Sequence, residues 1–262
     1  MARLEVMGSY LGKHAEYYDI FYQDKPYVKE AAFVDDLLRH YCLGDCEQLL
    51  ELACGTGRHA FELEKLGYEI VAIDYSADLL EIARKNARKG KSKVEFILQD
   101  MRELSLPGRQ FNATYCLFDS LGYVQTNDAI GRVIDAVYRH LKPQGLFIFE
   151  FWHAAAMLKY FEPVRERRWK TPDGELVRVA STRLDIPKQL AEVTYTITEF
   201  FDGHTNHLKE TQINRYFLIQ EMASYLENHH FAPLDFLPAY ETGTEITENT
   251  WHILAIAQKV DK

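Results

Sequence analysis

Across its first 150 residues the chain alternates short apolar runs with amphipathic segments of helical period. The apolar runs predict five strands, at 48–52, 69–73, 94–98, 112–118 and 146–151. Strands that alternate with helices are typical of a parallel sheet whose two faces are covered by those helices. We therefore expect an α/β fold.

Capping residues mark the ends of the predicted helices. Residues 29–41 and 58–66 have the apolar spacing of amphipathic helices. Ser76 is predicted to cap a third helix, and Asn127 a fourth that runs to Leu141. Each helix then follows or precedes a predicted strand, as the α/β pattern requires.

After residue 160 an alternation of apolar and polar residues replaces the helical period. It predicts three antiparallel strands, at 175–182, 189–200 and 207–217. A helix at 220–229 and two strands, at 233–240 and 251–260, then complete a seven-stranded, mostly parallel sheet. We expect a core domain of residues 1–160 and 218–262, and a β insertion of residues 161–217 that serves as a lid, a substrate wall or a dimer surface.

Composition excludes several classes of protein. A formal net charge of −9 disfavours nucleic acid, whose phosphates attract basic surfaces. No apolar run approaches about 18 residues and Met1–Glu5 has no apolar leader, so we expect a cytoplasmic protein without membrane insertion or export. The four cysteines lack paired CxxC spacing. Neither histidine pair, His204 with His207 or His229 with His230, has a Cys, Asp or Glu at ligand spacing, so the sequence predicts no metal site.

A glycine-rich loop follows the first strand, in the segment Glu51-Leu52-Ala53-Cys54-Gly55-Thr56-Gly57. Its glycines let the backbone approach a ligand, and the next helix offers unpaired N–H groups, as in nucleotide-cofactor loops. Gly55–Ala60 also fits the GxGxxG/A pattern of dinucleotide enzymes, and Asp74 suits a ribose in either cofactor. Glu51 favours a sulfonium or ammonium, because its charge would repel a pyrophosphate.

Three successive motifs resemble those of the class I S-adenosylmethionine-dependent methyltransferases, at 51–57, 73–76 and 99–102. The resemblance spans about residues 15–151 and implies a Rossmann-like fold. It further implies that Ala53 and Gly55 contact the methionine part through backbone, that Asp74 binds ribose and that Tyr75 packs on adenine. Asp100 and Met101 would recognise the amino edge of adenine. The predicted cofactor-binding residues are Tyr10, Tyr22, Glu51, Ala53, Gly55, Thr56, Gly57, Asp74, Tyr75, Asp100, Met101 and Leu117.

The methyl acceptor is expected beside the loop after the fourth strand, residues 117–123, where such a fold binds its substrate. The chain is similar to enzymes that methylate amino groups of nucleotide-linked sugars and to bacterial methyltransferases of unassigned substrate. It has Tyr123 where those amino-sugar enzymes tend to carry histidine, and His153 where they tend to carry tryptophan. Tyr123 and His153 are our predicted catalytic residues, able to orient an amine or accept its proton.

The predicted reaction transfers a methyl group from S-adenosylmethionine to nitrogen or oxygen of a small molecule, with S-adenosylhomocysteine as product. Two alternatives belong to other classes. The fold could serve as a non-catalytic cofactor-binding scaffold or sensor, since fold does not guarantee activity. The GxGxxA match instead suggests an NAD(P)-dependent oxidoreductase. Beyond the small-molecule acceptor, the partner we consider is a second copy of the chain, in a homodimer.

Overall fold

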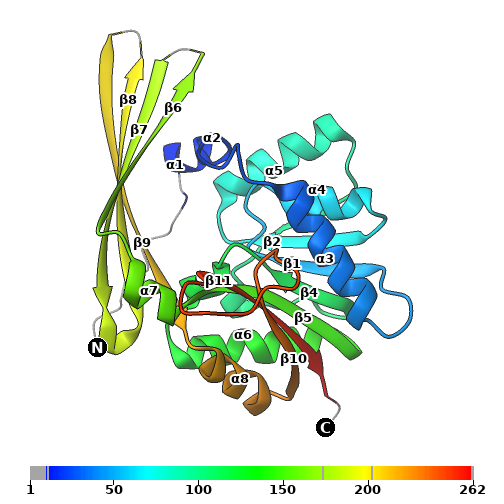
Figure 1. Cartoon of the computed structure of the whole chain (residues 1–262). Coiled ribbons are helices and arrows are strands. Elements are labelled where there is room, and N and C mark those ends of the chain that lie inside the picture. The colour runs from blue at the N-terminus through cyan, green and yellow to red at the C-terminus, as the bar shows by residue number, and fades with distance from the viewer. Residues whose placement is uncertain (1–9, 11, 173, 202, 261–262) are drawn as a thin grey trace.

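A central sheet of seven strands organises the protein in the order β3-β2-β1-β4-β5-β11-β10. The computed structural model describes residues 10, 12–172, 174–201 and 203–260 (Figure 1). β1 to β5 pair in parallel, and β11 is antiparallel to both β5 and β10. The predicted α/β fold with a mostly parallel sheet is confirmed. The strands are β1 (Gln48–Leu52), β2 (Glu69–Asp74), β3 (Glu95–Leu98), β4 (Phe111–Cys116), β5 (Leu141–His153), β10 (Phe231–Pro238) and β11 (His252–Lys259).

Helices cover both faces of this sheet (Figure 1). One hydrophobic core lies under α3, α4 and α5, and a second lies under α6 and α8. Leu49 and Leu50 are both fully buried but belong to opposite cores, because successive side chains of a strand point to opposite faces. The helices are α3 (Tyr27–Tyr41), α4 (Arg58–Lys65), α5 (Ala77–Gly90), α6 (Asn127–His140) and α8 (Ile219–Asn228).

The two predicted helix caps have different outcomes. Ser76 caps α5 as expected, its Oγ accepting a hydrogen bond from Leu79 N at 3.2 Å. The prediction for α6 is wrong by one residue, because Thr126 accepts from Ala129 N and is the cap. Asn127 is the first helical residue, and its Oδ1 instead accepts from Arg215. Both side chains can cap a helix, so their order along the chain does not decide between them.

The β insertion has four antiparallel strands rather than the three predicted. They are β6 (Val164–Thr171), β7 (Gly174–Asp185), β8 (Leu190–Phe201) and β9 (His204–Phe217), with the one-turn helix η3 (Ile186–Lys188) between β7 and β8. The missed strand, β6, is rich in Arg and Lys and exposes most of its side chains, so it lacks the alternation that signals a half-buried strand. β9 pairs with the last two residues of β5. The insertion therefore extends from the carboxyl edge of the central sheet, after α7 (Ala154–Tyr160).

Two short N-terminal helices, α1 (Lys13–Glu16) and α2 (Tyr18–Phe21), lie between the insertion and the core domain (Figure 1). Phe21 packs with Trp169, Leu176 and Ile197 of the insertion in a small hydrophobic cluster. On the other side, Thr56 Oγ1 in the glycine-rich loop donates to Asp19 at 2.8 Å. The N-terminal helices therefore connect the two parts of the molecule.

Within the described ranges no helix is both long and apolar enough to cross a membrane. Met1–Glu5, on which the expectation about export rests, lie outside the described residues.

Candidate active site

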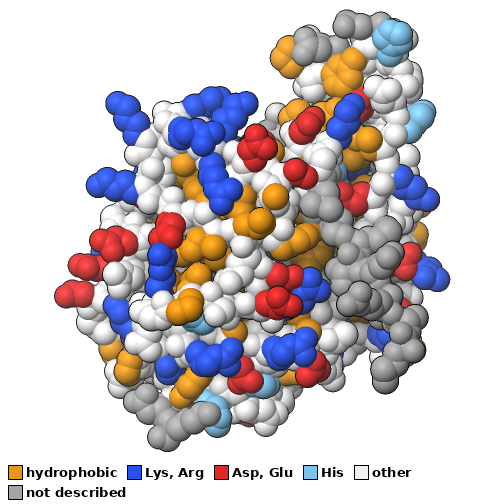
Figure 2. All heavy atoms as spheres, turned by 180° about the vertical axis from the view of Figure 1, so that it is seen from behind, with side chains coloured by type: hydrophobic (Ala, Val, Ile, Leu, Met, Phe, Trp, Pro, Cys, Tyr) orange, Lys and Arg blue, Asp and Glu red, His pale blue; other side chains and the backbone are white. Residues whose placement is uncertain are grey.

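One cavity of about 1480 Å³ opens at the carboxyl edge of the central sheet. Its walls come from the loops after β1, β2, β3 and β4, from the N-terminal helices and from the inner face of the insertion. From behind, Figure 2 shows hydrophobic side chains gathered in a hollow beside the projecting insertion, with charged side chains around it. The cavity lies where the sequence places the cofactor and the acceptor.

The glycine-rich loop contributes Ala53 and Gly55 to the cavity wall. Both have positive φ, 53° and 56°, a conformation that glycine adopts without strain. Gly57 also has a positive φ, 79°, and a Cβ there would lie 2.7 Å from the ring of Phe96. The loop thus turns sharply at Ala53 and Gly55, the two residues that it contributes to the cavity wall.

Asp74 fixes this loop at the end of β2. Its buried carboxylate accepts hydrogen bonds from Gly55 N and from Ser76 N, each at 2.8 Å. Burial raises the pKa of Asp74 to about 6, although those backbone hydrogen bonds oppose the shift. Tyr75, next in the chain, is partly exposed and lines the same cavity.

Asp100 and Met101 line the cavity after β3, at the start of the one-turn helix η1 (Met101–Glu103). Both carboxylate oxygens of Asp100 accept from Arg102 Nε at 2.9 Å. Burial raises the pKa of Asp100, but these hydrogen bonds outweigh it and hold the pKa below its ordinary value. Asp100 therefore stays a charged acceptor at neutral pH.

Some predicted cofactor residues lie elsewhere. Tyr10 and Tyr22 do line the cavity, and their hydroxyls are 3.3 Å apart. The cavity wall does not include Glu51, Thr56, Gly57 or Leu117. Thr56 donates a hydrogen bond to Asp19, Gly57 is the N-cap of α4, and Leu117 is packed into a core.

Glu51 needs a separate correction. Its side chain is buried behind the loop, and burial raises its pKa well above the ordinary range, with the nearby Asp74 adding to the shift. A carboxyl group with a raised pKa favours its neutral form. The expectation that a charge at Glu51 would exclude a pyrophosphate is therefore not supported by this geometry.

The two predicted catalytic residues differ in position. Tyr123 lines the cavity, and its hydroxyl donates to Gln212 at 3.0 Å. Burial raises the pKa of Tyr123 well above its ordinary value, so the phenol stays protonated and can position a substrate but is a poor base. His153 is not in the cavity wall, because it is buried with Nδ1 3.0 Å from the carbonyl oxygen of Thr250. This position does not support the prediction that His153 orients an amine or accepts its proton.

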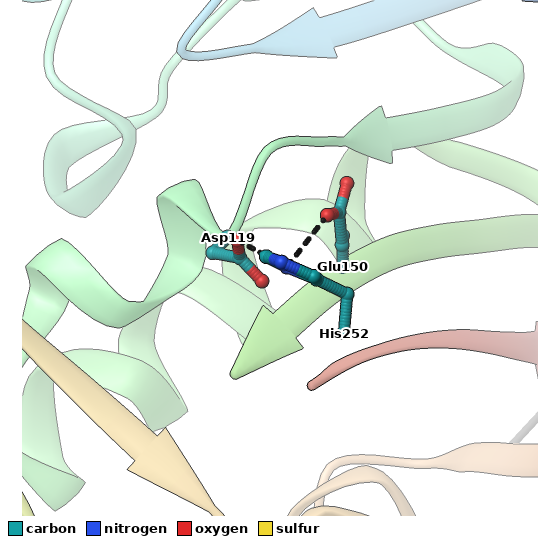
Figure 3. Close-up of side chains that lie close together, drawn as sticks. All are labelled: Asp119, Glu150 and His252. Atoms are coloured by element: carbon teal, nitrogen blue, oxygen red, sulfur yellow. Dashed lines mark hydrogen bonds and ion pairs between the residues drawn. The ribbon is translucent and has the colours of Figure 1, made fainter. Parts of the chain in front are cut away.

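A cluster that the sequence did not reveal lies beside the cavity, and two of its three members, Asp119 and His252, line the wall. His252 Nδ1 is 2.8 Å from Asp119 Oδ2 and 3.3 Å from Glu150 Oε1 (Figure 3). Tyr240 and the backbone N–H of Phe118 both donate to Glu150 Oε2 at 2.7 Å. The three residues come from the loop after β4, from β5 and from the start of β11, so no local motif joins them.

Charge compensation explains the pKa values in this cluster. Burial lowers the pKa of His252, but the Asp119 and Glu150 carboxylates outweigh it and raise that pKa to about 11. Burial also raises the pKa of Glu150, yet His252 outweighs it and lowers the value to about 2, whereas Asp119 rises to about 6, mainly through burial. The spacing of the three groups also suits a metal ion. Since the imidazolium of His252 already lies between the two carboxylates and pairs with both, we describe the cluster as an ion-pair network.

Comparison with known proteins agrees with this geometry. Residues 49–145 match the family described as "Methyltransferase domain". The chain is 34% identical over 141 residues to dTDP-3-amino-3,4,6-trideoxy-alpha-D-glucopyranose N,N-dimethyltransferase of Streptomyces venezuelae, a match that covers 53% of this chain and 57% of the relative. It is 26% identical over 246 residues to YqeM of Bacillus subtilis (strain 168), a proposed methyltransferase, covering 94% of this chain and 95% of YqeM.

A solved structure shares the whole fold. An S-adenosylmethionine-dependent methyltransferase from Clostridium acetobutylicum ATCC 824 superimposes with a TM-score of 0.81 at 21% identity, covering 94% of this chain and 97% of the other. Residues 49–145 carry the match to the methyltransferase domain, and the chain has the fold of the class I S-adenosylmethionine-dependent methyltransferases, whose methyl donor is S-adenosylmethionine.

The residues around the cavity fit this cofactor. Gly55 presents backbone without a side chain at the wall, and an added Cβ would come within 3.5 Å of the Tyr18 hydroxyl. Asp74 and Asp100 supply carboxylate acceptors, and Tyr75 supplies an aromatic face. The carboxylates match the hydroxyl and amino groups of the cofactor, and the aromatic face matches its adenine.

Proposed function

We propose that the chain methylates the amino nitrogen of a small molecule, a sugar amine, and releases S-adenosylhomocysteine. In this proposal the backbone of Ala53 and Gly55 holds the methionine part of the methyl donor, and Asp74 accepts hydrogen bonds from its ribose hydroxyls. Tyr75 packs on the adenine, while Asp100 and Met101 contact its amino edge. Every one of these residues lines the cavity, which supports the assignment.

The cofactor supplies an electrophilic methyl group on a sulfonium. In the transfer, the nitrogen lone pair forms the new N–C bond as the C–S bond breaks, and the methylated nitrogen then loses a proton to solvent. Most of the acceleration in such a displacement comes from alignment and exclusion of water. Tyr18 packs against Gly55 of the glycine-rich loop, and Tyr22, whose ring centroid is 4.8 Å from that of Tyr18, lines the same cavity.

One observation indicates that the acceptor group carries a proton that it can donate, as an amine or a hydroxyl does. Asp119 lines the cavity, yet its Oδ1 is buried without a hydrogen-bond partner. Leaving a buried carboxylate oxygen unpaired is unfavourable, and an amine N–H is a natural partner for it. By accepting that N–H, Asp119 would turn the nitrogen lone pair toward the methyl donor. The similarity to a sugar N,N-dimethyltransferase over about half of the chain supports a sugar amine.

The loop that carries Asp119 supports a functional role. Phe118 and Asp119 have φ values of 58° and 54°, which are unfavourable for residues with side chains. Consecutive residues in this conformation persist only where the surrounding structure holds them, and they occur often at functional sites. The loop lies between β4 and the short helix η2 (Ser120–Val124), and Asp119 lines the cavity from it.

The test measures S-adenosylhomocysteine release with paired amino and hydroxy sugars. We expect turnover with amines only, and we expect Asp119→Asn to lower kcat/KM at least about tenfold, the value of one charged hydrogen bond. Asp36→Asn, at an exposed position on α3, is the matched control. Binding of S-adenosylhomocysteine should be unchanged in both variants. Turnover of alcohols but not amines would overturn the proposal.

Location in the cytoplasm and assembly into a homodimer stay predictions, as does the role of the insertion as a lid or substrate wall. A small-molecule acceptor, rather than nucleic acid, is part of the proposal. Its support is the cavity of about 1480 Å³, which loops of the core, the N-terminal helices and the insertion line together, and the net charge of −9.

A further inference from the structure

Arg178 of β7 is a buried cation without an anionic partner among the described residues. Its side chain is 7% exposed, and its guanidinium carbon lies 4.4 Å from the ring centroid of Phe21, 4.9 Å from Tyr195 and 5.0 Å from Trp169. Aromatic faces attract the charge but do not satisfy its N–H groups, and Nη1 makes no hydrogen bond. A buried charge left in this state is unfavourable unless a ligand completes it.

A second arginine, Arg167, adds positive charge next to Arg178. Arg167 of β6 lies directly opposite Arg178 in the antiparallel pair, and it also lines the cavity. In the part of the chain that the structure describes, Arg167 makes no hydrogen bond or ion pair. Like charges directly opposite each other weaken a strand pair. The inner face of the insertion therefore concentrates positive charge that the protein itself does not neutralise.

This positive charge lies within reach of the proposed amine position. The guanidinium of Arg178 is 5.7 Å from the ring centroid of Tyr22, and the ring of Tyr22 is 4.9 Å from that of Phe118. Asp119 follows Phe118 in the chain. Two aromatic rings thus separate the cation from the carboxylate, a span that one small molecule can bridge inside the shared cavity.

We propose that Arg178, assisted by Arg167, binds an oxyanion of the methyl acceptor, either a phosphate or a carboxylate. The planar guanidinium matches both groups through paired N–H donors. Arg178 belongs to the insertion, whereas the proposed cofactor contacts come from the loops after β1, β2 and β3. The oxyanion is therefore assigned to the acceptor, which rests on the proposed function. The acceptor then carries an amine at one end and an anion at the other.

The test uses inorganic pyrophosphate and succinate as probes, titrated calorimetrically into protein saturated with S-adenosylhomocysteine. At least one probe should bind, and Arg178→Met should weaken that binding at least tenfold. The control is Arg183→Met on the same strand, at an exposed arginine paired with Glu192. Binding of pyrophosphate alone identifies a phosphate subsite, and binding of succinate alone identifies a carboxylate subsite.

A second readout separates binding from a structural role. Removing an uncompensated buried charge should leave the unfolding temperature of Arg178→Met equal to or above that of the wild type. Equal probe binding by wild type and Arg178→Met would overturn the proposal. So would an Arg178→Met variant that loses affinity for S-adenosylhomocysteine but keeps its affinity for the probe. Neither measurement needs turnover. A failed search for amine substrates would therefore not change the outcome of this test.

Discussion

Asp74 has two structural partners before any cofactor binds. Its carboxylate holds Gly55 N of the glycine-rich loop and Ser76 N at the start of α5. A single buried acid thus sets the spacing between two loops of the cavity. Because burial raises its pKa to about 6, the charge state of Asp74 changes close to physiological pH.

We therefore predict that affinity for S-adenosylhomocysteine depends on pH through Asp74. The ribose hydroxyls need an acceptor, and protonation below pH 6 removes one. The dissociation constant of the wild type should rise by up to about tenfold per pH unit below that value. Asp100 has a lowered pKa and stays charged over most of this range.

Calorimetric titrations from pH 5 to pH 8 test this prediction. Asp74→Asn should bind at least about tenfold more weakly at pH 8, because it loses a charged hydrogen bond. Its affinity should also be independent of pH across the range. A wild-type dissociation constant that stays constant from pH 8 to pH 5 would contradict the assignment of Asp74 to the ribose.

At the scale of elements, the strands of the central sheet were predictable because apolar runs and helical periods alternate there. The glycine-rich loop follows β1 and Asp74 ends β2, so topology alone brings them to one edge. β6 escaped prediction because exposed Arg and Lys residues hide its strand character. The position of His153 also escaped prediction, since its neighbour Thr250 lies far along the chain.

The cluster of Asp119, Glu150 and His252 shows most clearly what sequence could not supply. Its members come from a loop, from β5 and from β11, and only the antiparallel pairing of β5 with β11 brings His252 beside them. The register that sets this contact, with His252 opposite Trp152, depends on how the chain returns after the insertion. No spacing rule encodes such a return.

We predict that His252→Gln destabilises the fold by about 1–3 kcal/mol at pH 7, below the full cost of breaking a buried pair because the side chain of His252 is 44% exposed. The raised pKa of His252 means that its contribution is complete below pH 6.5 and is lost as pH rises through about 11. The lowered pKa of Glu150 means that its contribution is present above pH 4.5 and is lost as pH falls through about 2.

Chemical denaturation at several pH values measures this effect. The difference between wild type and His252→Gln should be large at pH 7, should begin to shrink as Asp119 takes up a proton near pH 6, and should shrink further as the pH falls toward 2, where Glu150 takes up its proton. His207→Gln, at an exposed histidine of β9, serves as the control and should match the wild type. A difference that does not vary with pH would show that packing, rather than charge, stabilises the contact.

At the scale of the whole molecule, the N-terminal helices connect the cofactor loop to the insertion. Tyr17 donates to Glu199 of β8 at 2.6 Å, and Lys13 pairs with the same carboxylate at 3.3 Å. At the other end, Thr56 of the glycine-rich loop donates to Asp19. These contacts hold a segment with two cavity-lining tyrosines, Tyr18 and Tyr22, between both parts of the site.

We predict that Glu199→Gln speeds both hydrogen exchange in residues 13–21 and dissociation of S-adenosylhomocysteine. The amide keeps the shape of the carboxylate but weakens its charged hydrogen bonds to Tyr17 and Lys13, so each rate should rise about tenfold. Glu192→Gln, on the same strand but at the exposed pair with Arg183, should change neither rate. Exchange mass spectrometry and stopped-flow displacement measure the two. Faster exchange with an unchanged dissociation rate would show that the N-terminal helices do not retain the cofactor, and that the loops after β1 to β3 suffice to hold it.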